Sequence, residues 1–337
     1  MSSESLLRGL HLIDVHCHLN GSIPPEAIAQ LVAEKSLLPG NEDLASFRLP
    51  TDMTSFSIHD FFPLFSSFIY RLTSSASSVT FATLSTLRYF ANCGCMYIEL
   101  RTTPRAVPEN GMTRRGYVEA VKAGFSAFEA EQGEGRAMLA KLILSIDRRH
   151  TKEVAEEVVD LAVEHRGWVV GVDLCGDPTE GDSREFVGAF GRAKREGLGV
   201  TVHLGELPSQ LESQADDLLL QPDRLGHATF LSPETTTYIL KQKLPIEICK
   251  TATSIEEHHL GWALEHDLPV LLCTDDPLIF HSPPSTEYSL ALSQCQPPRL
   301  EKLYEIVVQG TRALFCNDEE REWVRGKLRG WRKGLSE

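Results

Sequence analysis

The sequence predicts an α/β fold in which parallel strands alternate with helices. Eight short runs rich in Val, Ile and Leu are present, and each ends in polar or small residues. Longer segments with apolar residues at every third or fourth position separate them, for example 154–165 and 183–197, and this spacing is typical of amphipathic helices. Charged residues and histidines follow most of the runs. The runs span residues 11–18, 96–103, 141–147, 169–176, 199–206, 224–229, 245–252 and 269–276.

Eight repeats of strand and helix predict a closed TIM (β/α)8 barrel. A doubly wound open sheet is the alternative, but it gives no reason for polar residues to gather at nearly every strand end, whereas a barrel carries its reactive face there. The interval 19–95 is much longer than the others, and we expect it to hold extra helices that cap the C-terminal face. No linker or internal repeat divides residues 1–337, which we interpret as one domain. A solvated helix is expected over 317–334.

The composition excludes several classes of protein. Acidic residues exceed basic ones, 47 to 33, and the net charge of −14 opposes binding to nucleic acid or to anionic lipid. No apolar stretch approaches the roughly 18 to 20 residues of a membrane span, and the start shows no secretory leader, so we expect a cytoplasmic protein. The eight cysteines are scattered, which predicts reduced thiols. We expect a monomer that acts on a small molecule.

Histidines and carboxylates gather at the predicted strand ends. Because side chains alternate along a strand, His16 and His18 project to the same side, into the barrel. Structural core histidines are the alternative, but buried charges are costly unless they are paired or bound to metal. Three imidazoles and a carboxylate that leave an open position suit one zinc ion, and Lys141 lies at the wrong end of its strand to bridge a second. The residues at strand ends are His16, His18, His203, Glu206, His227, Asp275 and Asp276.

With these residues in place, the chain resembles the adenosine deaminase family of metal-dependent barrels, from LIDVHCHLNGS to LLCTDDPLIF. His-x-His on the first strand, HLGE on the fifth, GH on the sixth and TDDP on the eighth occur in family order. The cytidine-type zinc deaminases use a Pro-Cys-x-x-Cys motif, which is absent here. Within the family, HLNGS, LTSS, ELRTTPR, IDRR, DLCGDP and CTDD are most similar to the adenosine deaminase-like branch, the N6-methyl-AMP deaminases.

The resemblance implies zinc-dependent hydrolytic deamination at C6 of a 6-aminopurine. Glu206 would deliver a proton to purine N1, and His227 would orient the attacking water and stabilise the developing charge. For Asp147 and Gly176, which would face the sugar-phosphate region and the purine edge, the alternatives are a strand-end cap and a turn glycine. One zinc ion per chain would be held by His16, His18, His203 and Asp275. The implied substrate contacts include His18, Asp147, Gly176 and, at purine N7, Asp276.

Two features favour a substrate with a 5′-phosphate, and so the conversion of N6-methyl-AMP to IMP and methylamine. Ordinary adenosine deaminases have Asp where this chain has Asn20, and a carboxylate there would repel a phosphate. The segment Thr102, Thr103, Pro104 and Arg105 supplies hydroxyl groups and a fixed positive charge suited to phosphate. The alternative for Arg105 is a surface arginine paired with a carboxylate. The alternative substrates are adenosine, AMP or adenine, with release of ammonia.

The chain departs from the family pattern at two places. Tyr70, which we expect to contact substrate, stands near the position where relatives often have His, and residues Lys250–Thr253 read KTAT in place of Leu-Thr-Ser-Asn. Two other classes of function compete with a deaminase. A barrel hydrolase of amides or phosphoesters would use a similar metal site, and a silent binding protein would have lost at least one of His203, Glu206 or Asp275. All three are present.

Overall fold

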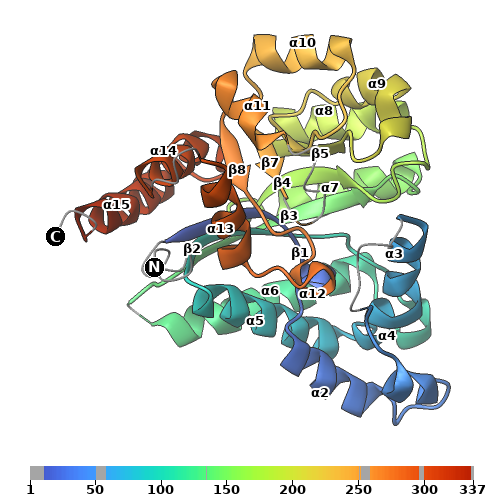
Figure 1. The fold of residues 1–337 in the computed structure, drawn as a ribbon. Coiled ribbons are helices and arrows are strands. Elements are labelled where there is room, and N and C mark those ends of the chain that lie inside the picture. The colour runs from blue at the N-terminus through green and yellow to red at the C-terminus, as the bar shows by residue number, and fades with distance from the viewer. Residues whose placement is uncertain are drawn as a thin grey trace.

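The computed structural model describes residues 11–50, 58–133, 135–249, 251, 259–295 and 300–334. Eight parallel strands form one sheet whose order follows the chain from β1 to β8 (Figure 1), and the predicted barrel is confirmed. The strands are β1 (Leu12–His18), β2 (Cys95–Thr102), β3 (Leu139–Asp147), β4 (Val169–Cys175), β5 (Gly199–Leu204), β6 (Arg224–His227), β7 (Ile246–Ile248) and β8 (Val270–Leu272).

The barrel closes between its last and first strands. The backbone N–H of Asp275 donates to the carbonyl of His16 over 2.7 Å, and the N–H of His18 donates to the carbonyl of Asp275 over 2.9 Å.

Strands β6, β7 and β8 are shorter than the sequence predicts. At His227 and Asp275 the backbone turns left-handed, with φ of 60° and 62°, a conformation that is incompatible with an extended strand.

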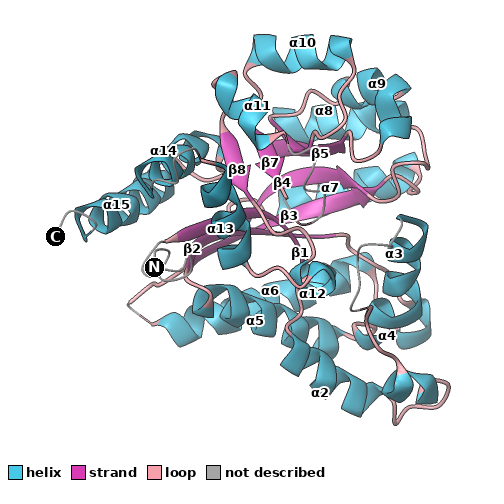
Figure 2. Ribbon diagram, viewed as in Figure 1, coloured by secondary structure: helices cyan, strands magenta, loops and turns pink. Residues whose placement is uncertain are grey.

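Helices surround the strands (Figure 2). Thr151 caps the helix α7 (Lys152–Glu164) by accepting a hydrogen bond from the backbone N–H of Val154, which satisfies one of the free donors at a helix start. The predicted helix over 183–197 is divided into a 3-10 turn and α8 (Val187–Arg195). The other outer helices are α5 (Ala76–Asn92), α6 (Arg114–Gln132), α9 (Gln214–Leu218), α10 (Pro233–Gln242), α11 (Leu260–Glu265), α13 (Pro284–Gln294), α14 (Leu300–Gly310) and α15 (Asp318–Gly334).

Extra helices after β1 form a cap over the C-terminal face of the barrel. They are α2 (Pro25–Lys35), α3 (Ile58–Leu64) and α4 (Tyr70–Leu72), with a π-helical turn at Phe65–Ile69. They build a second hydrophobic cluster that includes Leu31, Phe68 and Leu72. This cluster also contains Leu278 and Ile279 of α12 (Pro277–Phe280), so the cap is attached to the loop that follows β8.

The opposite end of the barrel is closed by packing. The Phe315 ring lies below the strands, where Gly171 and Gly199 leave room for it: a Cβ on Gly199 would lie 2.5 Å from the ring. The amine of Lys141 contacts Glu320 of α15 at 2.5 Å, which places this lysine at the end remote from the predicted site.

All eight cysteines lie among the described residues, and none forms a disulfide. Within the described part of the chain, no helix has the length and apolar character needed to cross a membrane.

Candidate active site

A pocket of about 260 Å³ opens at the C-terminal ends of the strands, under the cap. Phenylalanine rings from the cap and from α12 form an apolar wall: Phe61, Phe62, Phe65 and Phe280. The predicted residues that line the pocket are His18, Asn20, Tyr70, Thr102, Thr103, Asp147, Gly176, His203, Glu206, His227, Asp275 and Asp276. His16 lies just beneath them, while Pro104 and Arg105 are outside the lining.

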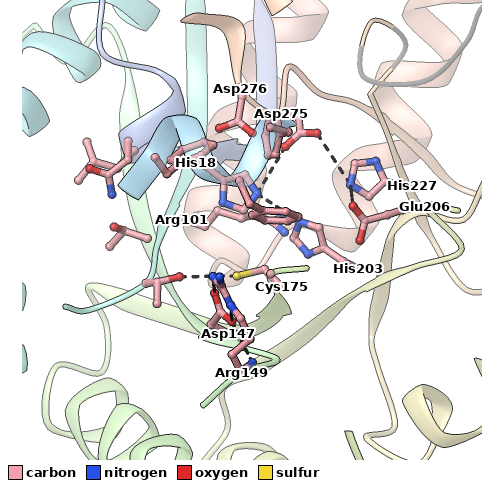
Figure 3. A pocket seen from close by; sticks show the side chains of 18 of the residues that line it. His18, Arg101, Asp147, Arg149, Cys175, His203, Glu206, His227, Asp275 and Asp276 are labelled. Carbon is pink, nitrogen blue, oxygen red and sulfur yellow. Dashed lines mark hydrogen bonds and ion pairs between the residues drawn. The ribbon is translucent and has the colours of Figure 1, made fainter. Parts of the chain in front are cut away.

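Four of the predicted residues converge on one point. Ligand atoms of His16, His18, His203 and Asp275 all lie within 4.8 Å of one another. One carboxylate oxygen of Asp275, Oδ1, is 3.5 Å from Nε2 of His16 and 3.4 Å from Nε2 of His18, and Figure 3 shows Asp275 above the His18 and His203 rings. Three imidazoles and one carboxylate form a donor set that suits a divalent metal such as zinc.

Hydrogen bonds orient the imidazoles so that their Nε2 atoms face this point. Nδ1 of His16 donates to Glu247 over 2.8 Å, and Nδ1 of His203 donates to Asp173 over 3.0 Å. Such partners fix the tautomer and leave Nε2 as the ligand atom. Nε2 of His16 is fully buried and makes no hydrogen bond among the described residues, which is costly unless a metal uses its lone pair. Burial also holds the pKa of His18 well below its usual value, so this imidazole is neutral and able to bind a cation.

Two buried arginines that were not predicted from the sequence hold these orienting carboxylates. Arg101 of β2 lies between Glu247 and Asp173, with nitrogen–oxygen distances of 2.8 and 3.2 Å. Arg224 of β6 joins Glu247 to Glu99 at 2.7 and 2.6 Å. Burial opposes the ionised form of Glu247, but Arg101 and Arg224 outweigh it and hold the pKa of this carboxyl well below its usual value. The signal in the sequence was Glu99 and Arg101 two positions apart on one strand, which places both on the same face of that strand.

A glycine and two strained positions complete the metal-binding end. A Cβ on Gly226 would lie 2.8 Å from the His16 ring, so the glycine of the Gly-His pair makes room for a predicted ligand. His227 and Asp275 both have positive φ, which is uncommon for residues other than glycine. Backbone strain of this kind concentrates at functional sites, and here it turns both side chains toward the cluster.

Glu206 and His227 lie next to the ligand cluster. Nε2 of His227 is 3.8 Å from one oxygen of Glu206 and 3.9 Å from Oδ2 of Asp275. The other oxygen of Glu206 is buried and makes no hydrogen bond among the described residues. Burial raises the pKa of Glu206 above its usual value and holds that of His227 well below it. A carboxyl group with a raised pKa is suited to proton transfer.

Asp276 faces the pocket beside Asp275. Its Oδ1 is buried without a hydrogen-bond partner among the described residues, and a Cβ on Gly21 would lie 1.5 Å from that oxygen. Gly21 therefore creates the space that Asp276 occupies. Burial and the charge of Asp275 raise the pKa of Asp276 well above its usual value, which favours a protonated carboxyl that can donate a hydrogen bond.

Asp147 and Gly176 line the other side of the pocket together with Arg149, which was not predicted from the sequence. Arg149 donates from Nε and Nη2 to the two oxygens of Asp147 over 2.8 and 2.6 Å. Gly176 has a φ of +97°, and a Cβ there would lie 2.7 Å from the Asp147 carboxylate. The glycine therefore permits both the left-handed turn and the close approach of Asp147. Figure 3 shows Asp147 and Arg149 well separated from the ligand cluster.

Of the residues predicted to bind the phosphate, two line the pocket and two lie outside its lining. Thr102 and Thr103 line the pocket, and the Thr102 hydroxyl shares a 2.8 Å hydrogen bond with that of Tyr117. Pro104 is buried. Arg105 lies behind the pocket wall, where its guanidinium is 4.1 Å from the centre of the Tyr70 ring. The described contacts of Arg105 are with Thr73 and with the Tyr70 and Tyr117 rings, and none is with a carboxylate, which argues against a surface arginine paired with an acid.

The Asn20 side chain uses both ends of its amide. Nδ2 donates to the Tyr117 hydroxyl over 3.2 Å, and Oδ1 accepts from the Thr73 hydroxyl over 3.0 Å. Arg105 in turn donates to the Thr73 carbonyl and hydroxyl over 2.8 and 2.7 Å. Asn20 is thus held as a neutral group in the pocket wall.

In the segment Lys250–Thr253, Thr251 donates to Glu287 over 2.5 Å, and the other three residues lie outside the described part of the chain.

Residues 12–331 match the adenosine deaminase family. The chain belongs to this family. This confirms the predicted class of enzyme, a hydrolytic deaminase of a metal-dependent family. The N6-methyl-AMP deaminase of Danio rerio is 35% identical over 86% of this chain and 86% of its own length. That of Homo sapiens is 31% identical over 94% of this chain and 91% of its own.

Solved structures agree with these relatives. The crystal structure of the Arabidopsis N6-mAMP deaminase superposes with a TM-score of 0.88 and 32% identity, and covers 97% of this chain and 99% of that one. A structure of Arabidopsis ADAL complexed with IMP superposes with a TM-score of 0.87 and 31% identity, over 97% of this chain and 98% of that one. The barrel and its cap are therefore shared with nucleotide-binding members of the family.

Proposed function

We propose that the chain is a zinc-dependent deaminase that converts N6-methyl-AMP and water to IMP and methylamine. The observation that carries the proposal is the convergence of His16, His18, His203 and Asp275 beside Glu206. Relatives named N6-methyl-AMP deaminase support the substrate. The structure of a relative with IMP bound supports the product. Monomeric state and cytoplasmic location stay predictions.

The four ligands would hold one zinc ion. When bound, zinc supplies a water of lowered pKa and a positive charge for developing oxyanions. His227 orients the attacking oxygen toward C6, and Glu206, whose pKa is raised by burial, delivers a proton to N1. Protonated Asp276 donates a hydrogen bond to N7, which is an acceptor. Glu206 recovers its proton from the attacking water, and the proton of the new C6 hydroxyl passes to N6. Cleavage of the C6–N6 bond then releases methylamine and leaves the C6 carbonyl of IMP.

The phosphate end of the pocket supports a nucleotide over a nucleoside. Asn20 presents a neutral amide, so no carboxylate at this position repels a 5′-phosphate. Arg105 lies behind Tyr70 and Thr73 without a described acidic partner. Its uncompensated positive charge attracts a phosphate in the pocket, because Coulomb attraction does not require direct contact. Thr102 and Thr103 add hydroxyl groups along the pocket wall.

The experiment that tests this function identifies the products. The purified protein is incubated with N6-methyl-AMP in H₂¹⁸O, and the products are analysed by mass spectrometry. We expect IMP that carries ¹⁸O at C6, together with one equivalent of methylamine. Release of phosphate, or of N6-methyladenine, would instead assign the site to a phosphoester or glycosidic hydrolase.

A further inference from the structure

Arg149 lies in the pocket wall at the end away from the ligand cluster. Its side chain is 49% exposed, and its guanidinium is 5.6 Å from the centre of the Phe62 ring of the cap. Figure 3 shows it with Asp147 on the side of the pocket opposite Glu206 and Asp275. A 6-aminopurine nucleotide whose C6 meets the ligand cluster directs its phosphate away from that cluster, toward this side.

The hydrogen bonds of Arg149 leave donors for a ligand. Nε and Nη2 donate to the Asp147 carboxylate, and the backbone N–H of Arg149 donates to the same group over 2.9 Å. A guanidinium has five N–H donors, and Nη1 makes no hydrogen bond among the described residues. Asp147 therefore fixes the guanidinium, whose positive charge offsets that of the carboxylate, while Nη1 stays available.

We propose that Arg149 binds the 5′-phosphate of the nucleotide directly and that Asp147 is its positioning residue. This inference rests on the proposed function and deepens it. Arg149 supplies donors at the pocket surface, whereas Arg105 lies outside the pocket lining, behind Tyr70, where its Nη2 donates to Thr73. The two arginines thus have different roles. Arg149 contacts the phosphate, whereas Arg105 contributes positive charge and packs behind Tyr70 in the pocket wall.

The chain contains a matched control for this arginine. Arg184 donates from Nε and Nη2 to Asp182 over 2.8 and 2.6 Å, and its backbone N–H donates to Asp182 over 3.0 Å. This is the same clamp with the same spacing, but Arg184 does not line the active-site pocket. The clamp alone is therefore not a sign of ligand binding, and what distinguishes Arg149 is its place in the pocket.

The test compares the binding of IMP and inosine, which differ only in the phosphate, to metal-loaded protein by isothermal titration calorimetry. The wild type should bind IMP more tightly than inosine. Arg149→Met should weaken IMP binding about ten- to a hundredfold, the scale of a charge-assisted hydrogen bond, and should affect inosine far less. Arg184→Met should leave both affinities unchanged. Thermal unfolding of each variant checks that the fold is retained.

A double variant separates the loss of the contact between Arg149 and the phosphate from the effect of an unpaired Asp147 charge. Arg149→Met also frees the charge of Asp147, which by itself repels a phosphate. If Arg149 binds the phosphate, the variant with both Asp147→Asn and Arg149→Met still loses the preference for IMP. Recovery of the wild-type preference in the double variant overturns the inference, as does an unchanged preference in Arg149→Met. Either result can occur while the wild type still deaminates N6-methyl-AMP, so it would leave the proposed function standing.

Discussion

Asp275 and His16 are joined across the seam of the barrel by a 2.7 Å hydrogen bond from the backbone N–H of Asp275 to the carbonyl of His16. Their side chains meet at the same point, with 3.5 Å between Nε2 of His16 and Oδ1 of Asp275. The closure of the barrel and the metal-binding cluster are therefore one structural feature. A metal bound there links the first strand to the segment after the last one.

Removal of the metal should therefore lower stability as well as activity. A ligand that binds only the folded state stabilises it by about 2.7 kcal/mol at a hundredfold excess over its dissociation constant. Purified protein should contain one zinc per chain by elemental analysis, and dialysis against a chelator should lower the melting temperature until zinc is restored. His16→Ala and Asp275→Ala should lose both metal and activity. Retention of two tightly bound metal ions per chain contradicts the single-zinc prediction.

Replacement of Glu206 separates proton transfer from metal binding. Glu206→Gln keeps the size of the side chain but cannot deliver a proton, and its carboxylate is not among the four converging ligands. We expect the zinc content to stay at the wild-type level while turnover falls at least about 10²-fold, the scale for loss of a general acid or base. Turnover near that of the wild type would show that another group supplies the proton.

Gly226→Ala should damage the metal site although it replaces none of the metal ligands. The added Cβ would lie 2.8 Å from the His16 ring, so the imidazole must move, and metal affinity should fall with it. Gly261→Ala is the matched control, because a Cβ there meets no atom within 4 Å. Zinc affinity measured with a competing chelator should drop only in the first variant. Equal affinity in both variants means that His16 does not need its present position.

Glu247 should be important for both the fold and the metal. It accepts hydrogen bonds from His16, Arg101 and Arg224, and Glu247→Gln leaves buried arginines without part of their counter-charge. Breaking a buried ion pair from one side costs about 3–5 kcal/mol, and loss of a group that orients a metal ligand lowers metal affinity about 10- to 100-fold. Urea unfolding and zinc titration measure the two effects. A variant that matches the wild type in both would show that the network is dispensable.

Asn20→Asp tests the neutral group at the phosphate end. An Asp cannot donate to the Tyr117 hydroxyl as the Asn20 amide does, and its charge would repel a phosphate. We expect kcat/KM for N6-methyl-AMP to fall about tenfold or more, which corresponds to about 1.4 kcal/mol, while kcat/KM for N6-methyladenosine falls less or rises. Parallel loss on both substrates would indicate a packing defect and not a charge effect.

The barrel and most of the site could be predicted because local sequence patterns indicate the strands and the residues at their ends. A strand shows as an apolar run, and the position of a histidine at its end places that side chain on the reactive face. The ends of β6 and β8 were placed too late because the left-handed conformations of His227 and Asp275 have no signal in residue types that are not glycine.

The supporting network could not be predicted in the same way. Arg101 and Glu247 are 146 residues apart in the chain, and an inward-facing charge on a strand looks in sequence like a solvent-facing one. Arg105 and Arg149 present the same difficulty. Both follow a strand, but only the folded chain shows that Tyr70 and Thr73 stand in front of Arg105 whereas Arg149 reaches the pocket.

The most direct test of the proposed nucleotide specificity is the ratio of kcat/KM for N6-methyl-AMP to that for adenosine, measured with zinc-loaded protein alongside AMP, N6-methyladenosine and adenine. The neutral Asn20 and the arginines near the phosphate end predict that N6-methyl-AMP is the best substrate of the panel and that the nucleosides react at least about tenfold less efficiently, the loss of one charge-assisted hydrogen bond. A higher kcat/KM for adenosine than for either nucleotide would contradict the account and make the chain an ordinary adenosine deaminase.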